Sequence, residues 1–200
     1  MRWIWIDSLV AFSPGQSASS VKNVTLAEEI LHDHFPHWPV FPPTLMVEGM
    51  AQTAGILVGE SRGFRENVVL AKLRHVELAR YAFPGQQIRY DATIVSVDDQ
   101  AAITSGKVLI EGEPAGTIDL IFSHVNGANA VGLPEHNFVF TDQFMHLVDD
   151  FRATHGIDLG NKSAGGGIQP PDKSDGPAND GSPAGSPTGL KSGEMEASIE

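Results

Sequence analysis

Residues 44–59 restrict the fold of this chain more than any other segment, because they combine the length of a helix with apolar side chains on nearly every side. A helix of this kind must be enclosed by other elements on most of its surface. Gly49, Gly55 and Gly59 each cost about 1 kcal/mol relative to alanine inside a helix, which suggests helix backbone pressed closely against neighbouring strands. The segment therefore predicts a buried central helix.

Runs of residues that favour β structure flank this helix on both sides. Turn signals separate the later runs, at Pro84 and Gly85, at Asp98 and Asp99, and at residues 111–114, and they predict antiparallel meander connections. Parallel strands would need a helix between successive strands, and the sequence offers none. We expect an α+β protein in which an antiparallel sheet curls around one helix. The predicted strands are residues 3–10, 18–24, 68–73, 76–81, 88–97, 101–110 and 115–124.

Composition divides the chain into a folded domain at residues 1–127, an extension at residues 128–160 and a tail at residues 161–200. In the extension, apolar residues spaced by three and four predict a short amphipathic helix over residues 141–154, which Gly156 can end. The tail holds 8 Gly, 6 Ser and 5 Pro in 40 residues. Such a segment cannot offset an ordering entropy of roughly 1–2 kcal/mol per residue, so we expect a disordered, passive tail.

Charge and composition exclude several classes of partner and of chemistry. The net charge of −12 would repel a phosphate backbone, so we expect no nucleic-acid partner. The chain has no cysteine, which excludes disulfides and thiolate chemistry. Residues 1–12 are apolar, but Asp7 and Ser8 interrupt them well short of the ~20 residues that a membrane span needs. We expect a cytoplasmic protein without membrane attachment, with an unconventional export signal as the less favoured alternative.

Few polar side chains interrupt the central helix. Glu48 and Gln52 lie one turn apart on one face, and Thr53 lies beside them. Burying an unpaired carboxylate is expensive, so Glu48 needs a role. It is either a catalytic group or the partner of a basic side chain at a subunit boundary.

Residues 32–43, just upstream, hold three histidines and four prolines. Proline fixes φ, so this segment predicts a rigid loop. His32, His34 and His37 suggest metal ligands, but no set with zinc-type spacing is complete. We expect ordinary imidazole roles and no bound metal.

The loop and the helix together carry a family resemblance. His34-Phe35-Pro36, then Pro39-Val40-Phe41-Pro42, then the octapeptide Leu-Met-Val-Glu-Gly-Met-Ala-Gln at residues 45–52 closely resemble the signature of the 3-hydroxyacyl-acyl-carrier-protein dehydratases of type II fatty acid synthesis. His34 and Glu48 stand 14 residues apart, the separation that this family uses. The similarity extends over about 120 residues, up to the strand that ends at His124.

The resemblance implies a hotdog fold and a homodimer, with a trimer of dimers left open, in which each active site combines the histidine of one subunit with the carboxylate of the other. His34 would be the base that removes the proton next to the thioester carbonyl, and Glu48 the acid that protonates the departing 3-hydroxyl. The product would be a trans-2-enoyl thioester, formed without metal or organic cofactor. The resemblance also implies substrate-binding roles for Phe35, Pro43, Thr44 and Gln52.

The chain departs from the family at three positions, where Asp33, His37 and Pro43 replace the usual glycine. In relatives, the residue that opens the helix donates a backbone N–H to the substrate carbonyl, and Pro43 has no N–H to donate. Either Thr44 N–H and the helix dipole take over, or the site is weakened, since one such donor is worth about 10²–10³ in rate. At the second position, we expect His37 to adopt a left-handed backbone.

The resemblance names acyl carrier protein, which is acidic, as the partner that presents the substrate. A basic rim formed by Arg62, Arg65, Lys72, Arg74 and Arg80 could guide it. Alternatively, Glu60, Glu66 and Glu77 neutralise these residues into an ordinary mixed surface. Two other functions remain open: an acyl thioesterase on the same fold, and a non-catalytic acyl-binding subunit that lost its carbonyl donor at Pro43.

Overall fold

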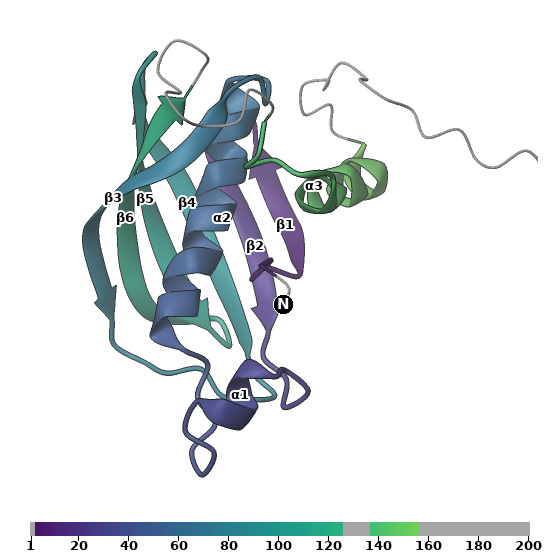
Figure 1. Ribbon diagram of the computed structural model, residues 1–200, viewed down its shortest axis with the longest axis vertical. Helices are drawn as coiled ribbons and strands as arrows, with labels where there is room; N and C mark the ends of the chain where they lie inside the picture. Colours follow the sequence, from purple (N-terminus) through teal and green to yellow (C-terminus); the bar gives the residue numbers. More distant parts are fainter. Residues whose placement is uncertain (1–2, 126–136, 157–200) are drawn as a thin grey trace, which may run out of the picture. The chain divides into compact units, whose positions relative to one another are not determined.

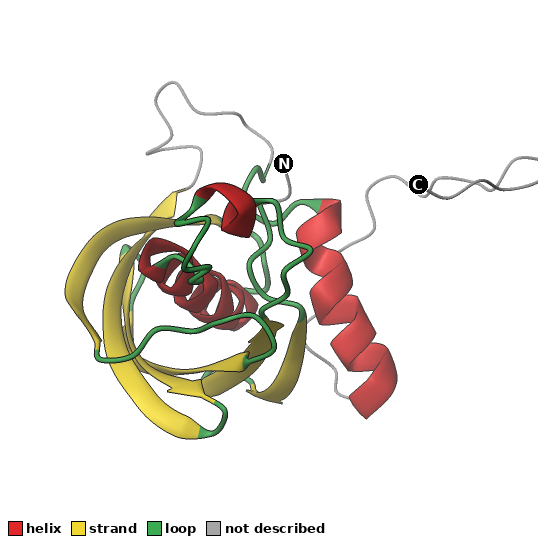
Figure 2. Ribbon diagram, turned by 90° about the horizontal axis from the view of Figure 1, so that it is seen from below, coloured by secondary structure: helices red, strands yellow, loops and turns green. Residues whose placement is uncertain are grey.

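A six-stranded antiparallel sheet curls around one long helix, α2, in the computed structural model of the chain (Figures 1 and 2). The structure describes residues 3–125 and 137–156, all of them within a first unit, Met1–Ser163. The expected disordered tail at residues 161–200 lies outside the described residues. The elements are β1 (Ser8–Ser13), β2 (Ser17–Asn23), α1 (Ile30–Asp33), α2 (Pro43–Ser61), β3 (Asn67–Leu78), β4 (Gln87–Val97), β5 (Ala101–Ile110), β6 (Glu113–Val125) and α3 (Asp142–His155).

The α+β prediction is confirmed, but the strand order differs from a simple meander. The sheet order is β1-β2-β4-β5-β6-β3, so β1 and β2 are neighbours, β4, β5 and β6 form a meander, and β3 lies beside β6 rather than beside β4. The turn at Pro84 and Gly85 leads from β3 to β4, which lie apart in the sheet, and the expected hairpin at this turn is wrong. Here the chain crosses the end of the fold, held by the backbone bonds from Phe41 N–H to Ala82 O (2.8 Å) and from Gly85 N–H to Val24 O (2.8 Å). The crossing lets the sheet enclose the helix from both edges.

Two strand predictions need correction. The two runs predicted at residues 68–73 and 76–81 belong to one strand, β3, which ends at Leu78, and irregularities between Leu70 and Lys72 and between Leu73 and His75 absorb the break in pattern. The first strand begins at Ser8 rather than residue 3. Upstream of it, Trp5 N–H donates to the side-chain oxygen of Gln52 (2.8 Å) instead of to a neighbouring strand.

Helix α2 packs against the concave face of the sheet, as its apolar composition predicted (Figure 2). Gly49 allows the closest approach: a Cβ atom there would lie 2.6 Å from the Tyr90 ring of β4. Thr53 donates to Gly49 O (2.8 Å) and shares a 2.5 Å hydrogen bond with Ser20 of β2. The close packing that the glycines suggested is therefore present at Gly49.

Helix α3 confirms the amphipathic helix predicted in the extension. It buries Met145, Val148 and Phe151, contacts β1 through the ring pair Phe151–Phe12 (6.4 Å), and ends at Gly156 in a left-handed conformation (Figure 1). Among the described residues, no helix has both the length and the apolar character that would let it cross a membrane.

Two glycines of α2, Gly55 and Gly59, predict opposite responses to alanine. A Cβ at Gly59 would collide with the buried ring of Phe140, whereas a Cβ at Gly55 would meet only Phe122 at an ordinary 3.9 Å. We expect Gly59→Ala to destabilise the protein by about 1–3 kcal/mol through overpacking. Its matched control, Gly55→Ala, should stabilise by about 0.5–1 kcal/mol, because alanine loses less backbone entropy in a helix. Urea unfolding of both variants checks this, and equal effects would contradict the packing described.

Candidate active site

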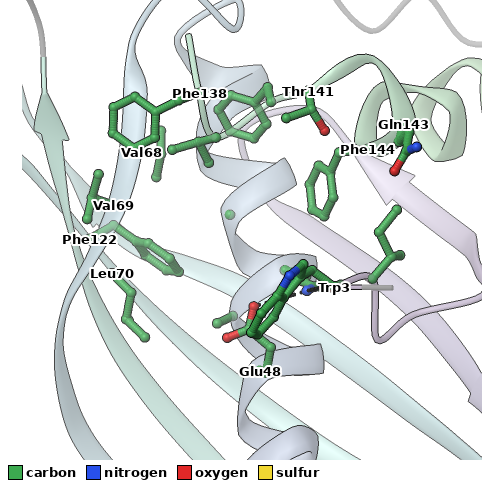
Figure 3. A pocket seen from close by; sticks show the side chains of 16 residues that line it. Trp3, Glu48, Val68, Val69, Leu70, Phe122, Phe138, Thr141, Gln143 and Phe144 are labelled. Atoms are coloured by element: carbon green, nitrogen blue, oxygen red, sulfur yellow. Dashed lines mark hydrogen bonds between the residues drawn. The ribbon is translucent and has the colours of Figure 1, made fainter. Parts of the chain in front are cut away.

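A cavity of about 540 Å³ runs along one face of α2 (Figure 3). Its volume lies within the range of about 300–1,000 Å³ that is typical of small-molecule sites. Helix α2 contributes Glu48, Ala51, Gln52 and Gly55, and the first residues of β3 face them with Phe122. The wall is mostly apolar, and Glu48 is the only charged side chain among the described residues that line it.

Glu48 is held in place by Gln52, one turn further along the helix. The Gln52 amide nitrogen donates to Glu48 Oε1 (3.0 Å) and to Trp3 O (2.7 Å), while its oxygen accepts the N–H of Trp5. These three bonds fix the orientation of the Gln52 amide. The Gln52 amide in turn fixes the position of the Glu48 carboxyl oxygen that accepts its hydrogen bond. No Lys or Arg in the described part of this chain forms an ion pair with Glu48.

Tyr90 packs beneath this part of the helix, against Gly49. Burial raises the pKa of its hydroxyl above the ordinary value, so the group stays neutral at neutral pH. Tyr90 therefore places no charge against the helix at Gly49, the residue that follows Glu48.

His34 occupies a different place in the chain. It ends the short helix α1, its N–H donates to Ile30 O (3.1 Å), and its half-buried ring lies 4.4 Å from the ring of Phe35. His34 is not among the residues that line the Glu48 cavity. Within one chain, the structure therefore does not bring these two predicted groups together in a single cavity.

The loop after His34 corrects the prediction for His37. Phe35, not His37, adopts the left-handed backbone, with φ of 55°. This turn is closed by Trp38 N–H, which donates to Phe35 O (2.7 Å). Trp38 then stacks edge-on against Tyr81 (5.2 Å) from the crossing segment. Sequence reasoning missed this exposed aromatic cluster, because its members are 43 residues apart.

The start of α2 is a cluster of prolines. Pro42 O accepts the N–H groups of Leu45 (2.9 Å) and Met46 (3.2 Å), and Pro43 occupies the first turn without a donor of its own. Thr44 is exposed, and its N–H has no acceptor in the described ranges. Thr44 thus offers the first free backbone donor at the positive end of the helix dipole.

The basic residues divide into two groups. Arg62 bonds Glu66 and Asp99, both at 3.1 Å, and these carboxylates hold the pKa of its guanidinium above the ordinary value. The other four residues of the predicted rim, Arg65, Lys72, Arg74 and Arg80, are exposed and form no ion pair among the described residues. Neighbouring carboxylates therefore neutralise Arg62, and the other four side chains remain exposed positive charges. No group of three or more His, Asp or Glu side chains gathers as a possible metal site in the part of the chain described.

An antiparallel sheet wrapped around one helix, with a cavity along that helix, is the architecture of the hotdog-fold proteins. The family model of the FabA-like domain matches residues 4–118, and the chain belongs to this family.

Individual proteins that are similar to the chain are named as dehydratases. The chain is 30% identical to the 3-hydroxyacyl-acyl-carrier-protein dehydratase FabZ of Listeria welshimeri over 122 residues, which cover 60% of this chain and 85% of that protein. It is 41% identical to the FabZ of Rhodospirillum rubrum over 90 residues, 44% of this chain and 56% of that one. Among solved structures, the dehydratase heterocomplex ApeI:P from Xenorhabdus doucetiae matches with a TM-score of 0.54 at 16% identity, over 65% of this chain and 88% of that chain. The last match concerns the fold alone.

Proposed function

We propose that this protein dehydrates (3R)-3-hydroxyacyl chains carried on acyl carrier protein to the trans-2-enoyl product in fatty acid biosynthesis. The observation that carries the proposal is the position of Glu48, a carboxyl held by Gln52 inside a mostly apolar cavity, in a chain of the FabA-like family. The relatives named as FabZ dehydratases support the same reaction. The pathway places the enzyme in the cytoplasm.

The reaction needs one base and one acid on the two sides of the breaking bonds. His34 takes the proton from C2, the electron pair forms the C2–C3 double bond, and the C3 hydroxyl leaves with a proton from Glu48 as water. A neutral imidazole has a free ring nitrogen that can accept a proton, which suits the role of a base. Gln52 positions Glu48, and Phe35 packs beside His34 at the substrate entrance. No metal or organic cofactor takes part.

The thioester carbonyl needs a donor as negative charge develops on its oxygen. Thr44 N–H, with the positive end of the α2 dipole behind it, supplies this donor in place of the N–H that Pro43 lacks. Pro43 and Thr44 thus form the carbonyl end of the substrate site.

The active site is completed in a homodimer. His34 does not line the cavity of its own chain, so a partner's His34 has to approach Glu48. Strand β3 offers the surface for pairing, since it has β6 on one side and, in the described ranges, no strand on the other. It also exposes Leu73 (49%) and Val76 (39%), apolar side chains that a second copy would cover. Acyl carrier protein binds at the exposed basic side chains of Arg65, Lys72, Arg74 and Arg80.

A panel of thioesters tests the proposal. Purified full-length protein receives 3-hydroxyacyl and saturated acyl chains on acyl carrier protein, and both enoyl absorbance and free thiol are followed. We expect enoyl formation from the 3-hydroxyacyl substrate and no thiol release. Thiol release from saturated chains would instead identify a thioesterase. Binding without either product would identify the acyl-binding subunit, the candidate that the missing donor at Pro43 favours.

A further inference from the structure

The end of the cavity opposite Glu48 is built by a segment that lies outside the FabA-like match. That match ends at residue 118, whereas the closing wall consists of Phe138, Val139, Phe140, Thr141, Gln143 and Phe144. Figure 3 shows Glu48 at one end of the cavity and Phe138 and Phe144 toward the other. The extension therefore gives this chain a cavity wall of its own.

Side-chain and backbone bonds anchor this segment. Asn67 of β3 accepts the N–H of Phe138 (2.9 Å), and the Asn137 amide donates to Glu66 O (3.2 Å) and accepts the N–H of Phe140 (2.9 Å). Phe140 is buried against Gly59 and meets the Phe64 ring edge-on at 5.1 Å. The segment is thus a fixed wall rather than a loose covering.

Beyond Gln52, which lines the cavity one turn after Glu48, the floor contributed by α2 is apolar. Eleven residues separate Glu48 from Gly59, where Phe140 packs, which corresponds to about 16 Å along the helix. Ala51 and Gly55 line the floor between them, and a Cβ at Gly55 would have only ordinary contact with its neighbours. An unbranched alkyl chain fits such a channel, since it needs apolar contact along its length and no polar partner.

We propose that Phe138, Phe140 and Phe144 form the closed end of the acyl pocket and set the longest acyl chain that the protein accepts. The inference rests on the proposed function, because it takes the acyl chain to run from Glu48 toward the extension. It assigns the extension a role in specificity: a chain that reaches the aromatic wall must displace the buried Phe140 ring or the partly buried Phe138 and Phe144 rings, and shorter chains need not.

The test uses two variants with opposite expected effects and one control. Phe144→Ala enlarges the closed end, and Gly55→Leu fills the floor; both residues line the cavity. Leu147→Ala removes a partly buried side chain of the same helix α3 that does not line the cavity. Calorimetry gives the Kd of non-hydrolysable amide analogues of butyryl-, decanoyl- and hexadecanoyl-pantetheine. Turnover of the matching 3-hydroxyacyl substrates is measured alongside, and circular dichroism checks the fold of each variant.

We expect Phe144→Ala to tighten binding of the longest chain relative to the shortest by about tenfold or more, and Gly55→Leu to shift this ratio by a similar factor in the opposite direction. Leu147→Ala should keep the length profile of the wild type. The inference is overturned if neither variant moves the profile, if Leu147→Ala moves it equally, or if the wild type binds none of the analogues. Enoyl formation with an unmoved profile defeats this inference alone, whereas a shifted binding profile without enoyl formation supports it and defeats the proposed dehydration.

Discussion

We expect Glu48→Gln and His34→Ala each to lower kcat for the proposed dehydration by about 10²–10⁴-fold, the contribution of a positioned acid or base. Glutamine keeps the size of Glu48 and an acceptor for the Gln52 amide, but it has no acidic proton to transfer. His34 is half-buried on a loop and its ring contacts Phe35, so its truncation removes the base without opening the core. Steady-state turnover of a 3-hydroxyacyl substrate on acyl carrier protein measures both effects.

A neighbouring histidine provides the control for these variants. His37 is exposed in the same loop, so His37→Ala should keep turnover within a few-fold of the wild type. All three variants should keep the wild-type melting temperature within a few degrees, because none of the three side chains is part of the buried core. Wild-type-like turnover in Glu48→Gln or His34→Ala would remove the corresponding residue from the mechanism.

Placing charge on the free edge of β3 should break the dimer and abolish activity together. The double variant Leu73→Glu with Val76→Glu replaces two exposed apolar side chains with carboxylates on the strand that we expect to meet its own copy. Uncompensated buried charges cost about 3–5 kcal/mol where a partner is missing, and the symmetry of a dimer doubles their number. We expect the mass in light scattering to fall from twice 21.4 kDa to 21.4 kDa, with turnover lowered by about 10²-fold or more.

The matched control for this variant is Val95→Glu. Val95 is exposed (62%) on β4, away from the β3 edge, so a charge there should leave both mass and turnover unchanged. A double variant that stays dimeric, or a wild type that is monomeric and fully active, would contradict the proposed assembly.

Much of the fold could be predicted because the decisive signals are local. The apolar run at residues 44–59 predicted α2 to within two residues at its C-terminal end, and β5 was predicted with its observed bounds. The order of the strands was not predictable in the same way. The pattern of residues 68–81 does not indicate that β3 pairs with β6, or that the following segment crosses the fold to reach β4. The pairing depends on how the whole sheet closes around α2.

In the candidate site, too, local features could be predicted, whereas contacts between distant segments could not. The spacing of Glu48 and Gln52 predicted side chains on one helix face, and the 3.0 Å bond between them agrees with it. The left-handed turn fell at Phe35 instead of His37, because the contact of Trp38 with Tyr81 from a distant segment fixes the loop. The wall formed by Phe138 and Phe144 was also missed, since a resemblance that ends before the extension cannot assign residues within it.

Mixed dimers test the central claim most directly. The His34→Ala and Glu48→Gln chains carry different affinity tags and are purified as heterodimers by two successive columns. If each active site joins the histidine of one subunit to the carboxylate of the other, one of the two sites in every heterodimer is intact, and turnover should be about half that of the wild-type dimer. Heterodimers as inactive as either parent variant would contradict the account.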